Sequence, residues 1–162
     1  MNKTLRSIAH TFYSDANLEL SNFIPETEGK EYAASTFQLN DLKVIYREGK
    51  ITPKKIGQFV TFWKRNSEGN TEPLHESDDF DFYIITVQHE NKTGQFIFSK
   101  SILIKQGIIS TQKKEGKRGF RLYPAWDNPT STQAIKTQCW QLNHFCDFSV
   151  QNSQHCLKIR IR

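Results

Sequence analysis

The chain has 162 residues and a formal net charge of +5. Its length suits one domain that buries roughly two thirds of its unfolded surface, and its twelve Phe, five Tyr and three Trp supply bulky core material. No apolar run approaches membrane-spanning length, and the N-terminus lacks the apolar core of a secretory signal. Three cysteines, an odd number, argue against a disulfide framework. We therefore expect a cytoplasmic protein without a membrane span.

The first third of the chain contains one clear periodic segment. Residues 4–14 place apolar side chains three and four positions apart, which predicts an amphipathic helix. Residues 15–29 show no period and are expected to form a loop. Residues 32–37 and 42–46 could be two strands or a helix followed by a strand, since their patterns fit both.

The segment 50–65 carries the strongest local signals. Thr-Pro at 52–53 is typical of a helix start, and Gly57 can end the helical turn after about one revolution. A helix start presents free N–H groups, so this turn, with two lysines inside it, is a candidate anion site. Residues 58–65 then alternate as a strand that ends in two cations.

The middle of the chain reads as a loop and a hairpin. Residues 66–79 are polar and acidic and are expected to form a loop. Residues 80–88 are apolar on both faces, which predicts a central strand. A turn over 91–94 then leads to a returning strand over 95–99.

The next segment starts with a helix signal at Ser99. This residue can cap a short helix over 100–106 that stops at Gly107. A basic turn over 113–117 precedes a strand over 119–123, which a proline ends.

The last segment begins with a capping box. Thr130 and Gln133 predict the start of a helix that runs to about Cys146, with an apolar face that includes Ile135 and Cys139. Apolar and basic residues alternate over 157–162, which predicts an edge strand.

These elements predict an α+β fold: a single domain with a mostly antiparallel sheet flanked by a few helices. Within this domain, residues 1–30 would form the N-terminal helix and loop. Residues 31–146 would form the main body, and residues 147–162 the C-terminal edge strand.

Charge is segregated along the chain. Residues 43–65 and 113–121 are strongly basic, whereas residues 68–90 contain seven acids and no Lys or Arg. Such runs often form solvated faces, and Arg118 and Arg121 could instead pair with the acidic segment within the chain. The basic runs would also serve an interface with a polyanion.

Aromatic residues among the cations favour nucleic acid as that partner. Lys and Arg would hold phosphates while exposed rings stack on bases. Trp140 is expected on the helix face opposite the apolar residues, although it could pack against another element instead. The candidate binding residues are Lys50, Lys54, Lys55, Lys64, Arg65, Lys117, Arg118, Arg121, Tyr123, Trp126, Gln138 and Trp140.

A divalent-metal nuclease is the alternative. Three acids before one strand and a lysine at the end of the next resemble the restriction-enzyme layout, in which carboxylates hold Mg²⁺. The acid expected two residues before the lysine is absent, because position 98 is Phe98. The candidate catalytic residues are Asp78, Asp79, Asp81 and Lys100.

Other chemistry lacks a sequence signal. The cysteines and histidines near the C-terminus do not have the paired short spacings of a zinc site. Cys139 and Cys146 are seven apart on the predicted apolar helix face, so we expect them to be buried thiols. Neither a nucleophile motif nor a glycine-rich phosphate loop is present, and we expect no haem or nucleotide cofactor.

Several blocks together resemble the MepB family of small bacterial proteins. They are Lys-Ile-Thr-Pro-Lys-Lys-Ile-Gly-Gln-Phe-Val at 50–60 with Trp-Lys-Arg at 63–65, Gly-Gln-Phe-Ile-Phe-Ser-Lys at 94–100, Gly-Lys-Arg-Gly-Phe-Arg-Leu-Tyr-Pro-Ala-Trp at 116–126, and Thr-Gln-Cys-Trp-Gln at 137–141. The chain departs from the family pattern at Ser99, where proline is expected, and at Gly119, where alanine is frequent.

The resemblance implies a cytoplasmic bacterial protein, encoded in some members near a multidrug efflux transporter and its repressor. It supplies no established activity. We therefore expect a nucleic-acid-binding protein without catalysis. The alternatives are the Mg²⁺ nuclease and a small-molecule or protein-interaction module linked to drug response.

Overall fold

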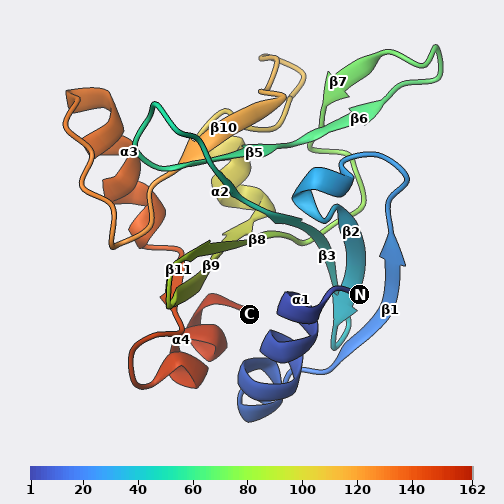
Figure 1. Cartoon of the computed structure of the whole chain (residues 1–162). Coiled ribbons are helices and arrows are strands. Elements are labelled where there is room, and N and C mark those ends of the chain that lie inside the picture. Colours follow the sequence, from blue (N-terminus) through green and yellow to red (C-terminus); the bar gives the residue numbers. More distant parts are fainter. Residues whose placement is uncertain (162) are drawn as a thin grey trace.

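A six-stranded sheet forms the centre of the computed structural model, which describes residues 1–161 (Figure 1). All neighbouring strands are antiparallel except β3 and β8, which are parallel. This arrangement confirms the predicted single-domain α+β fold with a mostly antiparallel sheet. The strands lie in the order β1 (Leu20–Pro25), β2 (Ser35–Leu39), β3 (Leu42–Glu48), β8 (Phe82–His89), β9 (Lys92–Ser99) and β11 (Phe145–Asp147).

Helices from both ends of the chain cover one face of this sheet (Figure 1). α1 (Lys3–Ile8) continues directly into a π-helix, η1 (Ala9–Tyr13), which together confirm the predicted N-terminal helix. Its buried side chains pack with those of α4 (Ser153–Arg160) in one hydrophobic core.

The opposite face carries the small sheet that positions the candidate site. Its strands lie in the order β10 (Gly119–Leu122), β5 (Gln58–Thr61) and β4 (Lys50–Ile51), all antiparallel. The helices α2 (Lys100–Lys105) and α3 (Thr132–Leu142) flank it, and the hairpin of β6 (Trp63–Arg65) and β7 (Thr71–Pro73) extends to one side (Figure 1). A short 3-10 helix, η2 (Lys30–Tyr32), precedes β2.

Strand β8 joins the two cores, as the prediction of a central strand requires. Phe82 and Ile84 point into the core that contains α1 and α4. Tyr83 and Ile85 point into the core beneath β5 and β10. This alternation buries the strand on both faces.

The cap at Ser99 is also confirmed. Its hydroxyl accepts a hydrogen bond from the Ile102 N–H at 3.4 Å, and Gly107 follows the helix with a φ of 68°.

Five local predictions between residues 15 and 94 are wrong. β1 lies within the expected loop 15–29, and β7 lies within the expected loop 66–79. Residues 52–57 form turns and bends instead of a helical turn, and the strand expected over 58–65 breaks at Phe62 into β5 and β6. The turn between β8 and β9 occupies only residues 90–91.

The predicted helix after Thr130 is displaced at both ends. Its cap is Ser131, whose hydroxyl accepts from the Ala134 N–H at 3.1 Å, and it ends at Leu142. The expected apolar face is turned outward, with Ile135 half-exposed and Cys139 exposed. Polar contacts with β10, described below, set the orientation of this helix.

The C-terminal edge strand is a helix in the structure, so that prediction is wrong. Ser153, Leu157 and Ile161 recur every four residues and are buried against the first core, which is a helical spacing. Arg162, the last residue of the predicted strand, lies outside the described residues.

A disulfide joins Cys146 in β11 to Cys156 in α4, with a Cα–Cα distance of 5.8 Å. The expectation of buried thiols at Cys139 and Cys146 is therefore wrong, because Cys146 is in a disulfide and Cys139 is exposed. In residues 1–161, no helix has the length and apolar character needed to cross a membrane.

Candidate nucleic-acid interface

Arg121 on β10 holds the hairpin loop between β4 and β5, residues 52–57. Its Nε donates to the Ile56 carbonyl at 3.2 Å, and its Nη2 donates to the Thr52 hydroxyl at 2.8 Å. Nη2 also donates to the carbonyls of Ile56 and Gly57, each at 3.1 Å. These acceptors are all neutral, so the guanidinium positions the loop and its charge is not cancelled by them.

The loop brings two lysines to the surface. Lys54 and Lys55 are exposed, and the ion pairs of residues 1–161 involve neither of them. Because these residues form turns instead of a helix, the predicted anion site at a helix start is wrong. Any anion binding here has to come from the lysine side chains.

Gly57 allows the loop to lie directly on the end of β10. Its φ is +89°, and a Cβ at this position would lie 2.6 Å from the Leu122 carbonyl oxygen and 2.8 Å from Cδ1 of Tyr123. A side chain is therefore excluded both by conformation and by space. The Tyr123 ring beneath the loop is only 9% exposed, so it forms a wall of the site and offers little open stacking surface.

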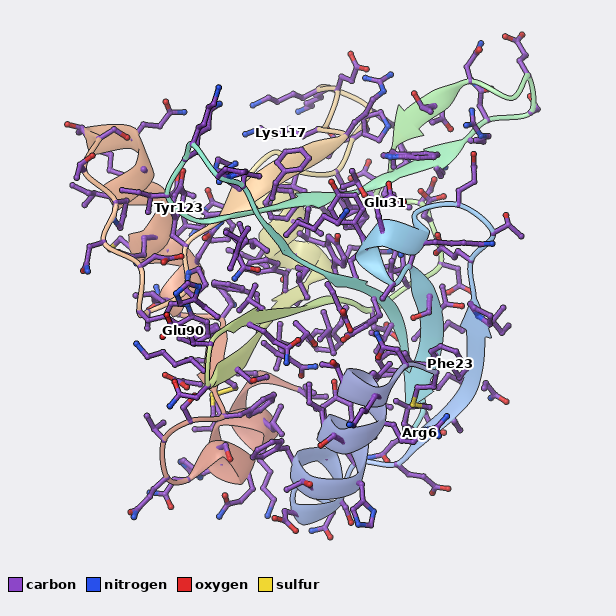
Figure 2. The ribbon with its side chains drawn as sticks, in the orientation of Figure 1. Arg6, Phe23, Glu31, Glu90, Lys117 and Tyr123 are labelled. Carbon is purple, nitrogen blue, oxygen red and sulfur yellow. A yellow bond between two sulfur atoms is a disulfide. The ribbon has the colours of Figure 1, made fainter. Side chains whose placement is uncertain are left out.

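A cavity of about 410 Å³ lies between β10 and α3. Figure 2 labels Lys117 and Tyr123, which mark the two ends of the β10 segment along it. Among the described residues that line the cavity, none is Asp or Glu. The lining includes Lys117, Gly119, Arg121, Tyr123, Gln133, Thr137, Trp140 and Gln141.

Two glutamines fix α3 against β10. The buried Gln141 side chain accepts from the Tyr123 N–H and donates to the Arg121 carbonyl, both at 2.9 Å. The Gln138 amide donates to the carbonyls of Pro124 at 3.0 Å and Asp127 at 2.8 Å. Gln138, predicted as a base contact, is therefore a structural contact here.

Trp140 joins the core and the cavity. Its ring lies 5.4 Å from that of Phe98 and 6.4 Å from that of His144, so one side packs on the core beneath β5 and β10. The residue is half-buried and also lines the cavity. Burial lowers the pKa of His144, which favours a neutral imidazole beside the indole.

Trp126 and Lys50 lie at the margins of this arrangement. The Trp126 ring packs edge-on against Phe145 at 5.6 Å, and its buried indole N–H has no hydrogen-bond partner within residues 1–161. Lys50 is exposed, and its ammonium lies 5.2 Å from the centre of the Tyr32 ring. Trp126 is thus a packing residue, while Lys50 presents its charge at the surface.

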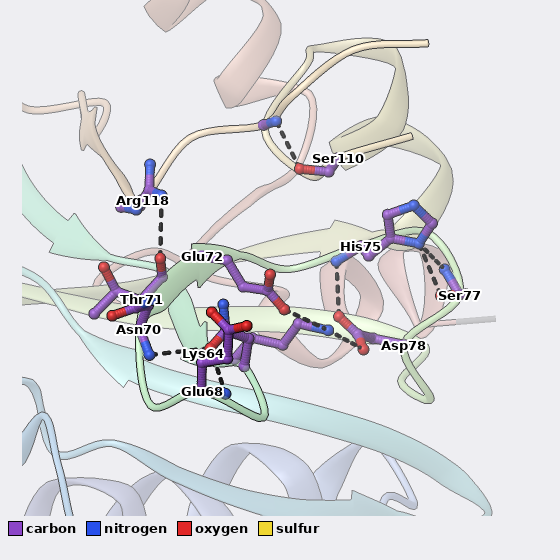
Figure 3. A network of polar contacts seen from close by, with 12 residues as sticks. Lys64, Glu68, Asn70, Thr71, Glu72, His75, Ser77, Asp78, Ser110 and Arg118 are labelled. Carbon is purple, nitrogen blue, oxygen red and sulfur yellow. Dashed lines mark hydrogen bonds and ion pairs between the residues drawn. The ribbon is translucent and has the colours of Figure 1, made fainter. Parts of the chain in front are cut away.

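Three predicted phosphate contacts are engaged within the protein; we call Lys64, Arg65 and Arg118 the paired cations. Lys64 pairs with Asp78 at 2.7 Å and with Glu72 at 3.6 Å (Figure 3). The hydrogen bond to Asp78 raises the pKa of Lys64.

The other two paired cations have their own partners. Arg65 pairs with Glu28 at 2.7 Å, and this hydrogen bond lowers the pKa of Glu28. Arg118 lies 3.5 Å from Glu115 and donates to the Thr71 carbonyl at 3.1 Å (Figure 3). The alternative that Arg118 and Arg121 pair with the acidic segment 68–90 is wrong, because Arg118 pairs with Glu115 and the acceptors of Arg121 are neutral. The cation that pairs with acids of this segment is Lys64.

The carboxylates of the nuclease alternative have separate partners. Asp78 binds Lys64 and the His75 N–H, Asp79 pairs with Lys43, and Asp81 accepts from the Lys43 N–H at 2.8 Å. The Lys100 ammonium donates to the main-chain carbonyls of Glu76 and Asp78. In the described part of the chain, no group of three or more His, Cys, Asp or Glu side chains is placed to hold a metal ion.

The sequence suggested Gln141, like Gln138, as a polar base contact, and its structural contacts with β10 were missed. The roles of Phe59 and Gly119 were missed as well. Directly opposite residues on β4, β5 and β10 place Lys50, Phe59 and Arg121 side by side on one face of the small sheet. A Cβ on Gly119 would lie 2.7 Å from the Phe59 ring, so glycine makes room for that ring. The sequence signal for this pairing was limited to the prediction of both segments, 58–65 and 119–123, as strands.

The fold and the site define a small α+β protein with an exposed lysine loop and a cavity whose described lining residues include no Asp or Glu. A family model described as MepB-like matches residues 26–147, well over half of the chain. The chain therefore belongs to the MepB-like family, and the resemblance seen in the sequence is confirmed.

A solved structure agrees with this assignment. The crystal structure of MepB has a TM-score of 0.81 and 29% sequence identity, and the match covers 93% of this chain and 100% of that chain. A bacterial homing endonuclease matches with a TM-score of 0.41 and 13% identity, over 88% of this chain and 93% of its own. At that score the likeness carries no information on activity. A search of the curated proteins finds no match.

Proposed function

We propose that this protein binds nucleic acid at the end of the small sheet, through the loop 52–57 and the cavity between β10 and α3. The observation that carries the proposal is the composition of this cavity. Lys117 and Arg121 line it from the β10 segment and Trp140 lines it from α3, and none of its described lining residues is acidic. A polyanion finds attraction here, with no carboxylate among the described lining residues, although the nearby Asp127 also interacts with the charge of Arg121.

The unpaired cations, Lys54, Lys55 and Lys117, are the phosphate contacts of this proposal. The ion pairs of the described chain use none of the three, so each keeps its charge for a ligand. Arg121 supports them by holding the loop, and its acceptors leave its own charge uncompensated.

The spread of these charges favours a polymer over a single small anion. Lys50 and Arg121 lie two strands apart on one face, which is about 10 Å between Cα atoms. The exposed loop lysines extend the positive charge beyond the cavity. Repeated phosphates along a nucleic-acid chain can contact such a row one after another, and each contact releases counterions.

The salt dependence of binding tests this function. A fluorescein-labelled single-stranded oligonucleotide is titrated with the full chain, and anisotropy is measured between about 50 and 200 mM salt. Three to five phosphate contacts predict that log K falls with log[salt] at a slope of roughly −2 to −3.5. Binding that is absent at low salt, or independent of salt, would contradict the proposal.

A further inference from the structure

We propose that the cavity between β10 and α3 accepts one unpaired base of a single strand, which the free edge of β10 hydrogen-bonds. This inference rests on the proposed function and specifies its ligand. It rests on three observations: main-chain groups directed at the cavity, an amide that already occupies half of that edge, and walls without acidic residues.

Strand β10 is an edge strand of the small sheet, so one side of its main chain has no partner strand. The Phe62 N–H donates to the Arg118 carbonyl at 2.8 Å, which makes this pair a hydrogen-bonded one in the antiparallel ladder. Hydrogen-bonded and non-hydrogen-bonded pairs alternate. The main-chain groups of Gly119, Arg121 and Tyr123 therefore point away from β5, toward the side occupied by the cavity and α3.

Gln141 shows what fits this edge. Its carboxamide bridges the Arg121 carbonyl and the Tyr123 N–H, as the N–H and C=O of one residue in a neighbouring parallel strand would. The equivalent bridge two residues earlier would join the Gly119 carbonyl and the Arg121 N–H. No side chain of the described residues makes it, so this donor and acceptor are left to the cavity.

A nucleobase has the matching chemistry. The Watson–Crick edge of each base carries a donor beside an acceptor, as a carboxamide does. In a duplex this edge is paired and stacked, so only an unpaired base can present it. The cavity, at about 410 Å³, is in the size range of small-ligand sites.

The walls suit a base that is attached to phosphates. Trp140 supplies an aromatic surface on one side, while Lys117 and Arg121 supply positive charge at the other. With no carboxylate among the described lining residues, this charge pattern favours an anionic strand over a cationic peptide. Base–aromatic contact of this kind tolerates any sequence.

The test separates base recognition from phosphate binding. Fluorescein-labelled dodecathymidylate is compared with an abasic 12-mer that has the same number of phosphates, both titrated with the full chain. The inference predicts about tenfold weaker binding of the abasic strand. Thr137→Phe, which fills the cavity from α3, should abolish this difference, whereas Thr132→Phe on the exposed start of the same helix should preserve it.

The possible results distinguish recognition of a base from binding of phosphates alone. Equal affinity for both strands, or a base preference that survives Thr137→Phe, would overturn the inference and leave the phosphate-binding function intact. If neither strand binds, the proposed function fails and the inference fails with it. Displacement of dodecathymidylate by a short extended peptide, but not by a thymidine mononucleotide, would assign the edge to strand addition and overturn the base proposal.

Discussion

The paired cations, on and beside the β6–β7 hairpin, already contact carboxylates of the protein. The unpaired cations, Lys54 and Lys55 in the loop 52–57 and Lys117 ahead of β10, take part in no ion pair of the described residues. Lys64 and Arg65 contact carboxylates at 2.7 Å, and Arg118 lies 3.5 Å from one. Lys54 and Lys55 extend from the loop 52–57, and Lys117 lines a cavity whose described lining residues include no Asp or Glu. Both groups look alike in the sequence, since each lies in a basic run that contains aromatic residues.

The comparison shows that the number of basic residues in the sequence overstates the number of cations that a ligand can contact at the surface. A lysine in an ion pair must leave its partner before it can contact a phosphate, whereas an exposed lysine needs only to shed counterions. The binding surface is therefore smaller than the basic segments of the sequence suggest. The following changes test whether the two groups of cations differ in this way.

Arg121→Met should have the largest effect of the single substitutions. It removes the hydrogen bonds that hold the loop, and we expect a loss of about 2 kcal/mol in the free energy of unfolding. This corresponds to a fall of roughly 4–8 °C in Tm, measured by circular dichroism. Oligonucleotide affinity should fall as well, because the loop lysines lose their position. Arg118→Met is the matched control, and equal Tm values for the two variants would contradict this role for Arg121.

Lys64→Met should have an intermediate effect on stability and little effect on binding. It leaves the half-buried Asp78 without its cation, which we expect to cost about 1 kcal/mol in denaturant unfolding. Affinity for the oligonucleotide should stay within about twofold of the wild type. A large loss of affinity without a loss of stability would place Lys64 in the binding surface instead.

Arg65→Ala should have a small effect that depends on pH. Because Arg65 lowers the pKa of Glu28 in the folded state, the pair stabilises the fold above the ordinary pKa of a glutamate, near 4.5. That contribution is lost as the pH falls through the lowered pKa. Thermal scans should therefore show a small difference in Tm between wild type and variant at pH 7, and none at roughly pH 2. A difference that grows toward low pH would have the wrong sign.

The sequence predicted those elements whose signals are local. The strand around Tyr83 is apolar on both faces, and Ser99 provides its own cap, so neither depends on distant residues. The orientation of α3 was missed because buried contacts of Gln141 with β10 outweigh the exposure of Ile135. Polar docking of this kind leaves no apolar period in the sequence.

The C-terminal prediction failed for a similar reason. Leu157 and Ile161 fit both an alternating strand and a helix with a four-residue repeat. In the structure Leu157 lies in the helix α4, which is bonded to β11 through Cys146–Cys156 and packed in the core beside α1. The pattern of residues 157–162 alone contains no information on either contact. For the candidate site, the sequence identified the cations and rings, but only the fold showed which cations are already paired.

The most direct measurement compares two triple variants of equal net charge. Lys54→Ala/Lys55→Ala/Lys117→Ala and Lys64→Ala/Arg65→Ala/Arg118→Ala each lower the formal charge from +5 to +2. For a labelled single strand, the first variant should reduce the magnitude of the salt slope by about 2, and the second should leave it near the wild-type value. Equal slopes for the two variants would show that total charge governs binding, and would contradict the claim that the fold decides which cations are available.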